Sequence, residues 1–151
     1  MKNILLVSLL LSSVSAFAAE HTVKMLNMGK DGTMVFEPGV LTIEVGDTVN
    51  FVATDMAHNS ASVLTPAGVS PWFGKMSKDI SVTFDTEGVY IYECTPHKMM
   101  AMVGVIQVGG SPVDEATLNF AQRYKKNFVM NQSRLDQYLG QLWGTSLFIW
   151  Y

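Results

Sequence analysis

Short runs in which apolar and polar residues alternate, separated by turn residues, extend from His21 to about Val108. This period-two pattern is typical of β-strands with one buried face. Gly, Pro and Asp fall between several of the runs, where they favour tight turns. The pattern predicts strands over residues 22–26, 34–36, 40–45, 48–53, 80–84, 89–93 and 103–108.

Seven short strands separated by turn residues predict an all-β fold, a two-sheet antiparallel β-sandwich with Greek-key connections. Residues 60–77 follow the pattern weakly, so we expect a surface loop there with one short strand near Val63. The 151 residues are enough for one domain with a well-covered core and too few for two ordinary ones. We therefore expect a single domain over residues 19–151.

After residue 110 the apolar spacing becomes helical. Ser111 is a good N-cap residue, Pro112 suits the first helical position, and Asp114 is an acid in the first turn. A second helix is predicted over residues 132–142 from the helical stripe of Leu135, Tyr138, Leu139 and Leu142. We expect these two helices to pack on one side of the sandwich.

The first residues have the pattern of a secretory signal. Lys2 gives a positive start, residues 4–11 are apolar apart from one serine, and Ala16 and Ala18 are small residues at the positions that a signal peptidase reads. A transmembrane anchor needs about 20 apolar residues, and this run is much shorter. We predict a signal peptide over residues 1–18, no membrane span, a location in the periplasm, and a mature chain that begins at Ala19 or Glu20.

Charge and cysteine content narrow the possible roles. The formal net charge is −3, and it becomes one unit more negative when Lys2 leaves with the signal peptide, so we expect no nucleic-acid partner. Exported proteins usually carry an even number of cysteines, joined in disulfides, but this chain has a single one, Cys94. Its thiol is either an inert buried group or a functional one.

Cys94 begins a run of possible metal ligands, Cys-x2-His-x4-Met, and His58 follows the end of an earlier predicted strand. One thiolate, two imidazoles and a weak thioether form the ligand set of trigonal copper sites in electron-transfer proteins. A soft thiolate favours Cu(I) and imidazole also accepts Cu(II), so an electron moves with little rearrangement. From spacing alone, the thioether ligand stays open among Met99, Met100 and Met102.

Six further pieces of sequence occur in a particular order: MVFEP at 34–38, GDTV at 46–49, TD at 54–55 before HN at 58–59, GVY at 88–90, CTPH at 94–97 and MVG at 102–104. Together they resemble the cupredoxin family of blue copper proteins and, within it, the pseudoazurins, over about residues 20–142. The resemblance implies a cupredoxin-like sandwich with two C-terminal helices and an electron-transport role. It also implies one copper ion, cycling between Cu(I) and Cu(II), bound by His58, Cys94, His97 and Met102.

The resemblance assigns supporting roles to three more residues. Asn59 would tie the two ligand loops together and present its backbone N–H to the Cys94 sulfur. Pro96 would withhold a second N–H from that sulfur, and Met34 would pack near the His97 ring.

The resemblance also implies partners such as dissimilatory nitrite reductases, with electrons passing through His97, and we expect a monomer. Pseudoazurins usually surround this histidine with lysines. Here Met28, Met56 and Glu93 stand at such positions, while Lys30, Lys75, Lys78 and Lys98 are present. We therefore expect docking that depends more on apolar contacts and less on salt concentration.

Other functions fit the residues less well. A copper carrier or buffer is the main alternative, but the ten methionines are largely scattered along the chain. An enzyme is not expected, because this ligand set leaves no open metal position and a Cys–His hydrolase would need an orienting third group. If cleavage follows Ala18, the new amine, the amides and the His21 imidazole could chelate Cu(II) in a square plane. The ordinary interpretation of His21, which we prefer, is an incidental polar residue before the first strand. No role is assigned to the apolar tail, residues 143–151.

Overall fold

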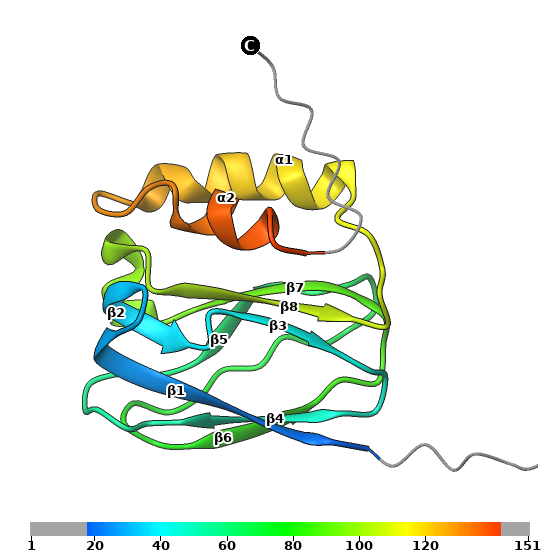
Figure 1. Ribbon diagram of the computed structural model, residues 1–151, viewed down its shortest axis with the longest axis horizontal. Coiled ribbons are helices and arrows are strands. Elements are labelled where there is room, and N and C mark those ends of the chain that lie inside the picture. The colour runs from blue at the N-terminus through cyan, green and yellow to red at the C-terminus, as the bar shows by residue number, and fades with distance from the viewer. Residues whose placement is uncertain (1–17, 143–151) are drawn as a thin grey trace, which may run out of the picture.

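The computed structural model describes residues 18–142, and these form a sandwich of two four-stranded sheets with two helices over the outer face of one sheet (Figure 1). Most of the predicted signal peptide and the apolar tail lie outside the described residues. The strands are β1 (Glu20–Gly29), β2 (Gly32–Glu37), β3 (Val40–Ile43), β4 (Thr48–Val52), β5 (Ala61–Leu64), β6 (Ile80–Thr83), β7 (Gly88–Glu93) and β8 (Val103–Val108). The helices are η1 (Thr95–Met100), α1 (Glu115–Tyr124), η2 (Lys125–Asn127) and α2 (Arg134–Leu139), of which η1 and η2 are 3-10 helices.

The strand order is β2-β1-β4-β6 in one sheet and β3-β8-β7-β5 in the other. The predicted sandwich is confirmed, and β5 is the short strand expected near Val63. The expectation of purely antiparallel sheets is wrong, because β1 pairs with β4 and β3 pairs with β8 in parallel. The chain crosses to the second sheet after β2 and returns after β3, so β4 lies beside β1 in the same direction.

The space between the sheets is filled by aromatic side chains from both inner faces. Tyr92 meets Phe36 and Phe51 edge-on, with ring centroids 4.7 and 5.0 Å apart, and Phe84 meets Tyr90 at 4.9 Å. Burying each such ring stabilises the fold by about 1.5–3 kcal/mol relative to exposing it. Cys94 and Met102 belong to the same buried cluster, so the candidate ligands are held by the rigid core.

The helices cover the sheet that contains β8 (Figure 1). All six residues of β8 are buried, since one face of the strand meets the other sheet and the other lies beneath the helix layer. The predicted apolar stripe is confirmed: its residues pack into a second buried cluster against this sheet, namely Leu135, Tyr138, Leu139 and Leu142. The helix itself is shorter than the predicted 132–142 and ends at Leu139.

The predicted start of the first helix is wrong. The N-cap is Asp114, whose side chain accepts a hydrogen bond of 2.7 Å from the backbone N–H of Thr117, and not Ser111. Residues 111–114 belong to no helix or strand, and Asp114 itself has an extended backbone. Within this segment Val113 is buried in the helix-side cluster. These residues therefore connect β8 to the helix layer before α1 begins.

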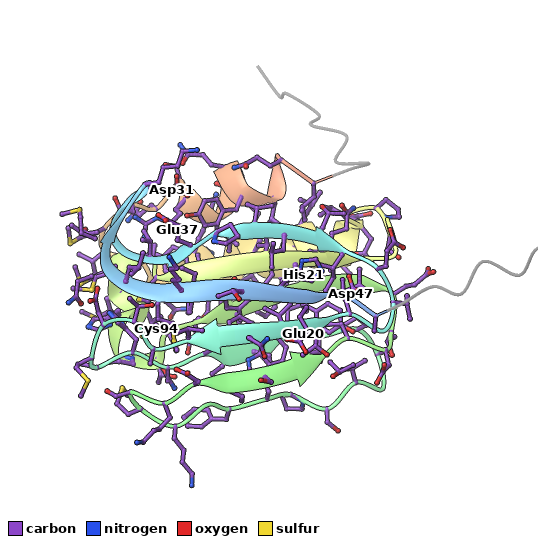
Figure 2. All side chains as sticks on the ribbon, turned by 60° about the horizontal axis from the view of Figure 1, so that its bottom comes forward. Glu20, His21, Asp31, Glu37, Asp47 and Cys94 are labelled. Atoms are coloured by element: carbon purple, nitrogen blue, oxygen red, sulfur yellow. The ribbon has the colours of Figure 1, made fainter. Side chains whose placement is uncertain are left out.

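The two ends of the sandwich carry different groups. Cys94 lies toward one end, whereas His21 and Asp47 lie toward the other (Figure 2). Among residues 18–142, no helix has the length and apolar content needed to cross a bilayer.

Candidate metal centre

Three possible ligand atoms converge at the Cys94 end of the sandwich. The Sγ atom of Cys94 lies 3.5 Å from Nδ1 of His58 and 3.4 Å from Nδ1 of His97, and the two Nδ1 atoms are 3.1 Å apart. His58 comes from the loop between β4 and β5, while the other two come from the loop between β7 and β8. Within the described part of the chain, this is the one group of three or more His, Cys, Asp or Glu side chains that converges in this way.

The loop between β7 and β8 is closed by its own backbone. The N–H of His97 donates to the Cys94 carbonyl at 3.0 Å, and the N–H of Met102 donates to the His97 carbonyl at 3.3 Å. Pro96 stands in the first turn of η1, and Ala101 ends it with a left-handed φ of 56°. The N–H of Cys94 then donates to the Met102 carbonyl at 2.9 Å, so the two ends of the loop, Cys94 and Met102, lie side by side.

Burial distinguishes the three methionines that spacing left open. Met99 is 60% exposed, Met100 is half-buried, and Met102 is fully buried in the cluster that contains Cys94. Met34 is half-buried and packs against this same cluster. Met102 is therefore the methionine that the fold places beside the cysteine.

A residue outside the predicted set orients His58. Its Nε2 lies 2.9 Å from Oδ1 of Asn27 in β1. An amide oxygen only accepts, so Nε2 carries the proton and the lone pair of Nδ1 faces Cys94. Sequence reasoning missed Asn27, because nothing in its local pattern marks a contact made 31 residues away.

Asn59 joins the two ligand loops, as expected. Its side-chain oxygen accepts from the backbone N–H of Thr95 at 2.9 Å, and its Nδ2 donates to Thr95 Oγ1 and to the Gly74 carbonyl, both at 3.2 Å. Asn59 is itself buried. The His58 loop and the Cys94 loop are thus fixed relative to one another before any metal binds.

The surroundings of His58 and Cys94 favour their neutral forms when no ion is bound. Burial lowers the pKa of His58, and the neighbouring His97 lowers it further. Burial raises the pKa of the Cys94 thiol, although the backbone N–H groups of Asn59 and His97 act in the opposite direction. A bound cation reverses this preference, because it stabilises the thiolate directly.

The dimensions and chemistry of the site fit a copper ion. A triangle with edges of 3.1, 3.4 and 3.5 Å leaves about 2 Å from its centre to each corner. This is close to the bond lengths of about 2.0–2.3 Å that imidazole nitrogen and thiolate sulfur make to Zn²⁺, another divalent ion of the first transition row. A thiolate, two imidazoles and a nearby thioether match the ligand preferences of copper in electron transfer.

His21 does not join this group. Its Nε2 lies 2.8 Å from Oδ2 of Asp47, and both residues are at the opposite end of the sandwich (Figure 2).

Comparison with known proteins identifies the family. Residues 23–109 match the copper binding proteins of the plastocyanin/azurin family. The chain is 44% identical over 137 residues to a pseudoazurin-type protein of Rhizobium leguminosarum bv. viciae, covering 89% of this chain and 88% of that one. It is 39% identical over 137 residues to the pseudoazurin of Paracoccus pantotrophus, covering 89% and 92%.

Among solved structures, native pseudoazurin from Hyphomicrobium denitrificans superposes with a TM-score of 0.70 at 40% identity, over 82% of this chain and 98% of that one. The chain therefore belongs to the plastocyanin/azurin family of copper-binding proteins, in its pseudoazurin branch, whose members carry electrons on one copper ion and are not enzymes.

Proposed function

We propose that this protein carries single electrons between larger redox enzymes of the periplasm, with His58, Cys94, His97 and Met102 holding its copper ion. The observation that carries the proposal is the convergence of one sulfur and two Nδ1 atoms within 3.5 Å of one another. The ion, when bound, supplies a Cu(I)/Cu(II) couple. The protein keeps its ligands in place through the change, because both ligand loops are tied by Asn59 and by backbone hydrogen bonds.

The two histidines have different roles in this proposal. His58 is fully buried, with its Nε2 occupied by Asn27, whereas His97 is half-buried. The His97 ring is thus the ligand that reaches the surface, and it serves as the route for electrons.

Exposed methionines surround the route. Met99 is close to His97 in the chain, and Met56 is two residues before His58. Met28 follows Asn27, which binds His58, and Met76 precedes Ser77, whose N–H donates to the His58 carbonyl at 2.7 Å. We call these four residues the methionine rim; their exposed fractions run from 48% to 73%.

The rim supports a partner that docks by apolar contact. Lys98, the lysine next to His97, is neutralised by Glu93, with 3.4 Å between Nζ and Oε1. The family resemblance supports a respiratory reductase such as a dissimilatory nitrite reductase as the acceptor, and the predicted signal peptide supports the periplasm.

A copper carrier or buffer is the second candidate, and the exposed thioethers of the methionine rim favour it, because thioethers bind Cu(I). The two functions differ in what leaves the protein. An electron carrier cycles between oxidation states at constant copper content, whereas a carrier of copper releases the ion to its target.

The test is the visible absorption and electron-spin spectrum of the purified protein after addition of Cu(II), followed by repeated reduction and oxidation with copper content measured at each cycle. We expect an intense thiolate-to-copper band that is lost in Cys94→Ser, shifted in Met102→Leu and unchanged in the control Met130→Leu, with constant copper over the cycles. Copper binding without that band, or loss of copper on each reduction, would contradict the proposal.

A further inference from the structure

Arg134, at the start of α2, is a buried cation whose partners are backbone carbonyls. Its side chain is 5% exposed. Nη1 donates to the carbonyls of Ala101 at 2.8 Å, Met34 at 2.9 Å and Met100 at 3.5 Å, and Nη2 donates to those of Asp31 and Thr33, both at 3.2 Å. Within the described residues, no carboxylate lies at ion-pair distance from it.

In this arrangement the guanidinium N–H groups are occupied by backbone carbonyls. Burying a charge is unfavourable unless its donors are satisfied, and here carbonyl dipoles provide the compensation. The planar fork of arginine presents several N–H groups in fixed directions, which a lysine cannot reproduce. Arg134 therefore holds the segments that it contacts in one relative position.

Two segments of the chain supply these carbonyls. One runs from Asp31, in the turn between β1 and β2, to Met34 in the first half of β2, and the other is the end of the ligand loop, directly before Met102. Met34 and Ala101 both have left-handed backbone conformations, with φ of 49° and 56°. Residues other than glycine adopt these at a cost, and Nη1 bonds the carbonyl of each.

Residues that precede Arg134 add further hydrogen bonds to the ligand loop. The N–H groups of Val129 and Met130 donate to the Met99 carbonyl at 2.7 and 3.1 Å, and Asn131 Nδ2 donates to the Met100 carbonyl at 3.3 Å. The carbonyls of residues 99, 100 and 101 are thus all bonded by the segment that leads from α1 into α2. Figure 2 shows Asp31, in the turn between β1 and β2, beside this helix layer.

We infer that Arg134 is a positioning residue for the copper site: it sets where Met102 and Met34 stand relative to the three converging ligand atoms. The C-terminal helices then adjust the thioether contact to the ion, in addition to covering the sandwich. This inference rests on the proposed function and deepens it. The axial ligand tunes the potential of such sites. Loss of the Arg134 hydrogen bonds would therefore make Met102 more mobile, weaken its donation to Cu(II) and raise the reduction potential.

The test compares three variants. Arg134→Met removes every side-chain donor, and Arg134→Lys keeps the charge without the planar guanidinium. Leu135→Ala is the matched control. Leu135 is the next residue of the same helix and fully buried, so its truncation weakens the helix layer while leaving the five carbonyl bonds. Three quantities are measured: hydrogen exchange of the Ala101 and Met102 amides in copper-free protein, the intensity ratio of the two thiolate-to-copper bands, and the reduction potential.

We expect both Arg134 variants to speed exchange of these amides by about tenfold or more in the copper-free protein, to change the band ratio and to raise the potential. Leu135→Ala should lower the melting temperature without these changes. Arg134 variants that lose thermal stability but keep wild-type exchange, band ratio and potential would overturn the inference. If Arg134→Met fails to fold, the same three measurements on Arg134→Lys test the inference. A wild-type protein without the thiolate-to-copper band would instead contradict the proposed function.

Discussion

Nε2 of His58 lies 2.9 Å from Oδ1 of Asn27, and this contact determines which nitrogen of the ring faces the metal centre. The proton is held on Nε2, so the lone pair of Nδ1 is free for a ligand bond. A polar residue near the end of β1 thus orients a ligand that belongs to the loop between β4 and β5.

Replacing Asn27 with Ala removes the oxygen that orients this ring. We expect copper affinity to fall by about 10–100-fold, as is usual when a hydrogen-bond partner of a ligating histidine is lost, while the thiolate-to-copper band remains because Cys94 is unchanged. Competition against a chelator of known affinity measures the effect. Asn127→Ala is the control, since the Asn127 side chain donates to the Tyr124 carbonyl, within the helical layer. Equal affinity in wild type and Asn27→Ala would refute this role.

The methionine rim predicts weak dependence of docking on salt. We expect the second-order rate of electron transfer to a copper nitrite reductase to fall less than about threefold between low and physiological ionic strength, since screening acts mainly on exposed charges. Introducing lysines as Met28→Lys with Met56→Lys should make that dependence steeper. Ala116→Lys, at an exposed position of α1, adds a charge away from the rim and should leave the salt dependence nearly unchanged. Stopped-flow kinetics over a salt series decides; a steep fall for the wild-type protein would contradict rim-based docking.

Asp47 predicts a stability change in acid. Hydrogen bonds from His21 and from the backbone N–H groups of Ala19 and Glu44 hold the pKa of this buried carboxyl below its usual 3.8. A lowered folded-state pKa contributes stability that is fully present above 3.8 and is lost as the pH falls through the folded-state value.

We therefore expect Asp47→Asn to destabilise the copper-free protein by about 1.5–3 kcal/mol at neutral pH, the range for hydrogen bonds to a charged group. The difference from wild type should shrink below pH 4 as the wild-type carboxyl becomes protonated. Thermal denaturation over a pH series measures it, with Asp85→Asn as an exposed-carboxylate control. A wild-type-to-variant difference that stays constant down to the most acidic pH would argue against this account.

Tyr124 anchors α1 to the sheet beside the ligand loop. Its hydroxyl donates to Oε2 of the buried Glu93, whose other oxygen faces Lys98 at 3.4 Å. Tyr124→Phe leaves that carboxylate short of a donor, so we expect a loss of about 1–3 kcal/mol in the free energy of unfolding. Chemical denaturation measures the loss. Tyr90→Phe is the comparison, because the Tyr90 hydroxyl donates to the Thr86 carbonyl. In that variant a carbonyl and not a carboxylate loses its donor. An equal or smaller loss in Tyr124→Phe than in Tyr90→Phe would contradict the prediction.

The strands and the loop that carries Cys94, His97 and Met102 were predictable from the sequence, because both depend on neighbours in the chain. Alternation of apolar residues follows the strand period directly, and residues 94–102 are close enough in sequence to close on themselves once Pro96 and Ala101 make their turns. The ligand types alone also indicated copper.

The tertiary structure decided what depends on distant segments. Only packing shows that Met102 and not Met99 lies beside Cys94, that Asn27 orients His58, and that Arg134 reaches carbonyls about 100 residues earlier in the chain. The same holds for the parallel pairing of β1 with β4. Local periodicity reports which face of an element is buried, whereas the partner across the core is selected by how whole sheets and helices fit together, which no short window of sequence records.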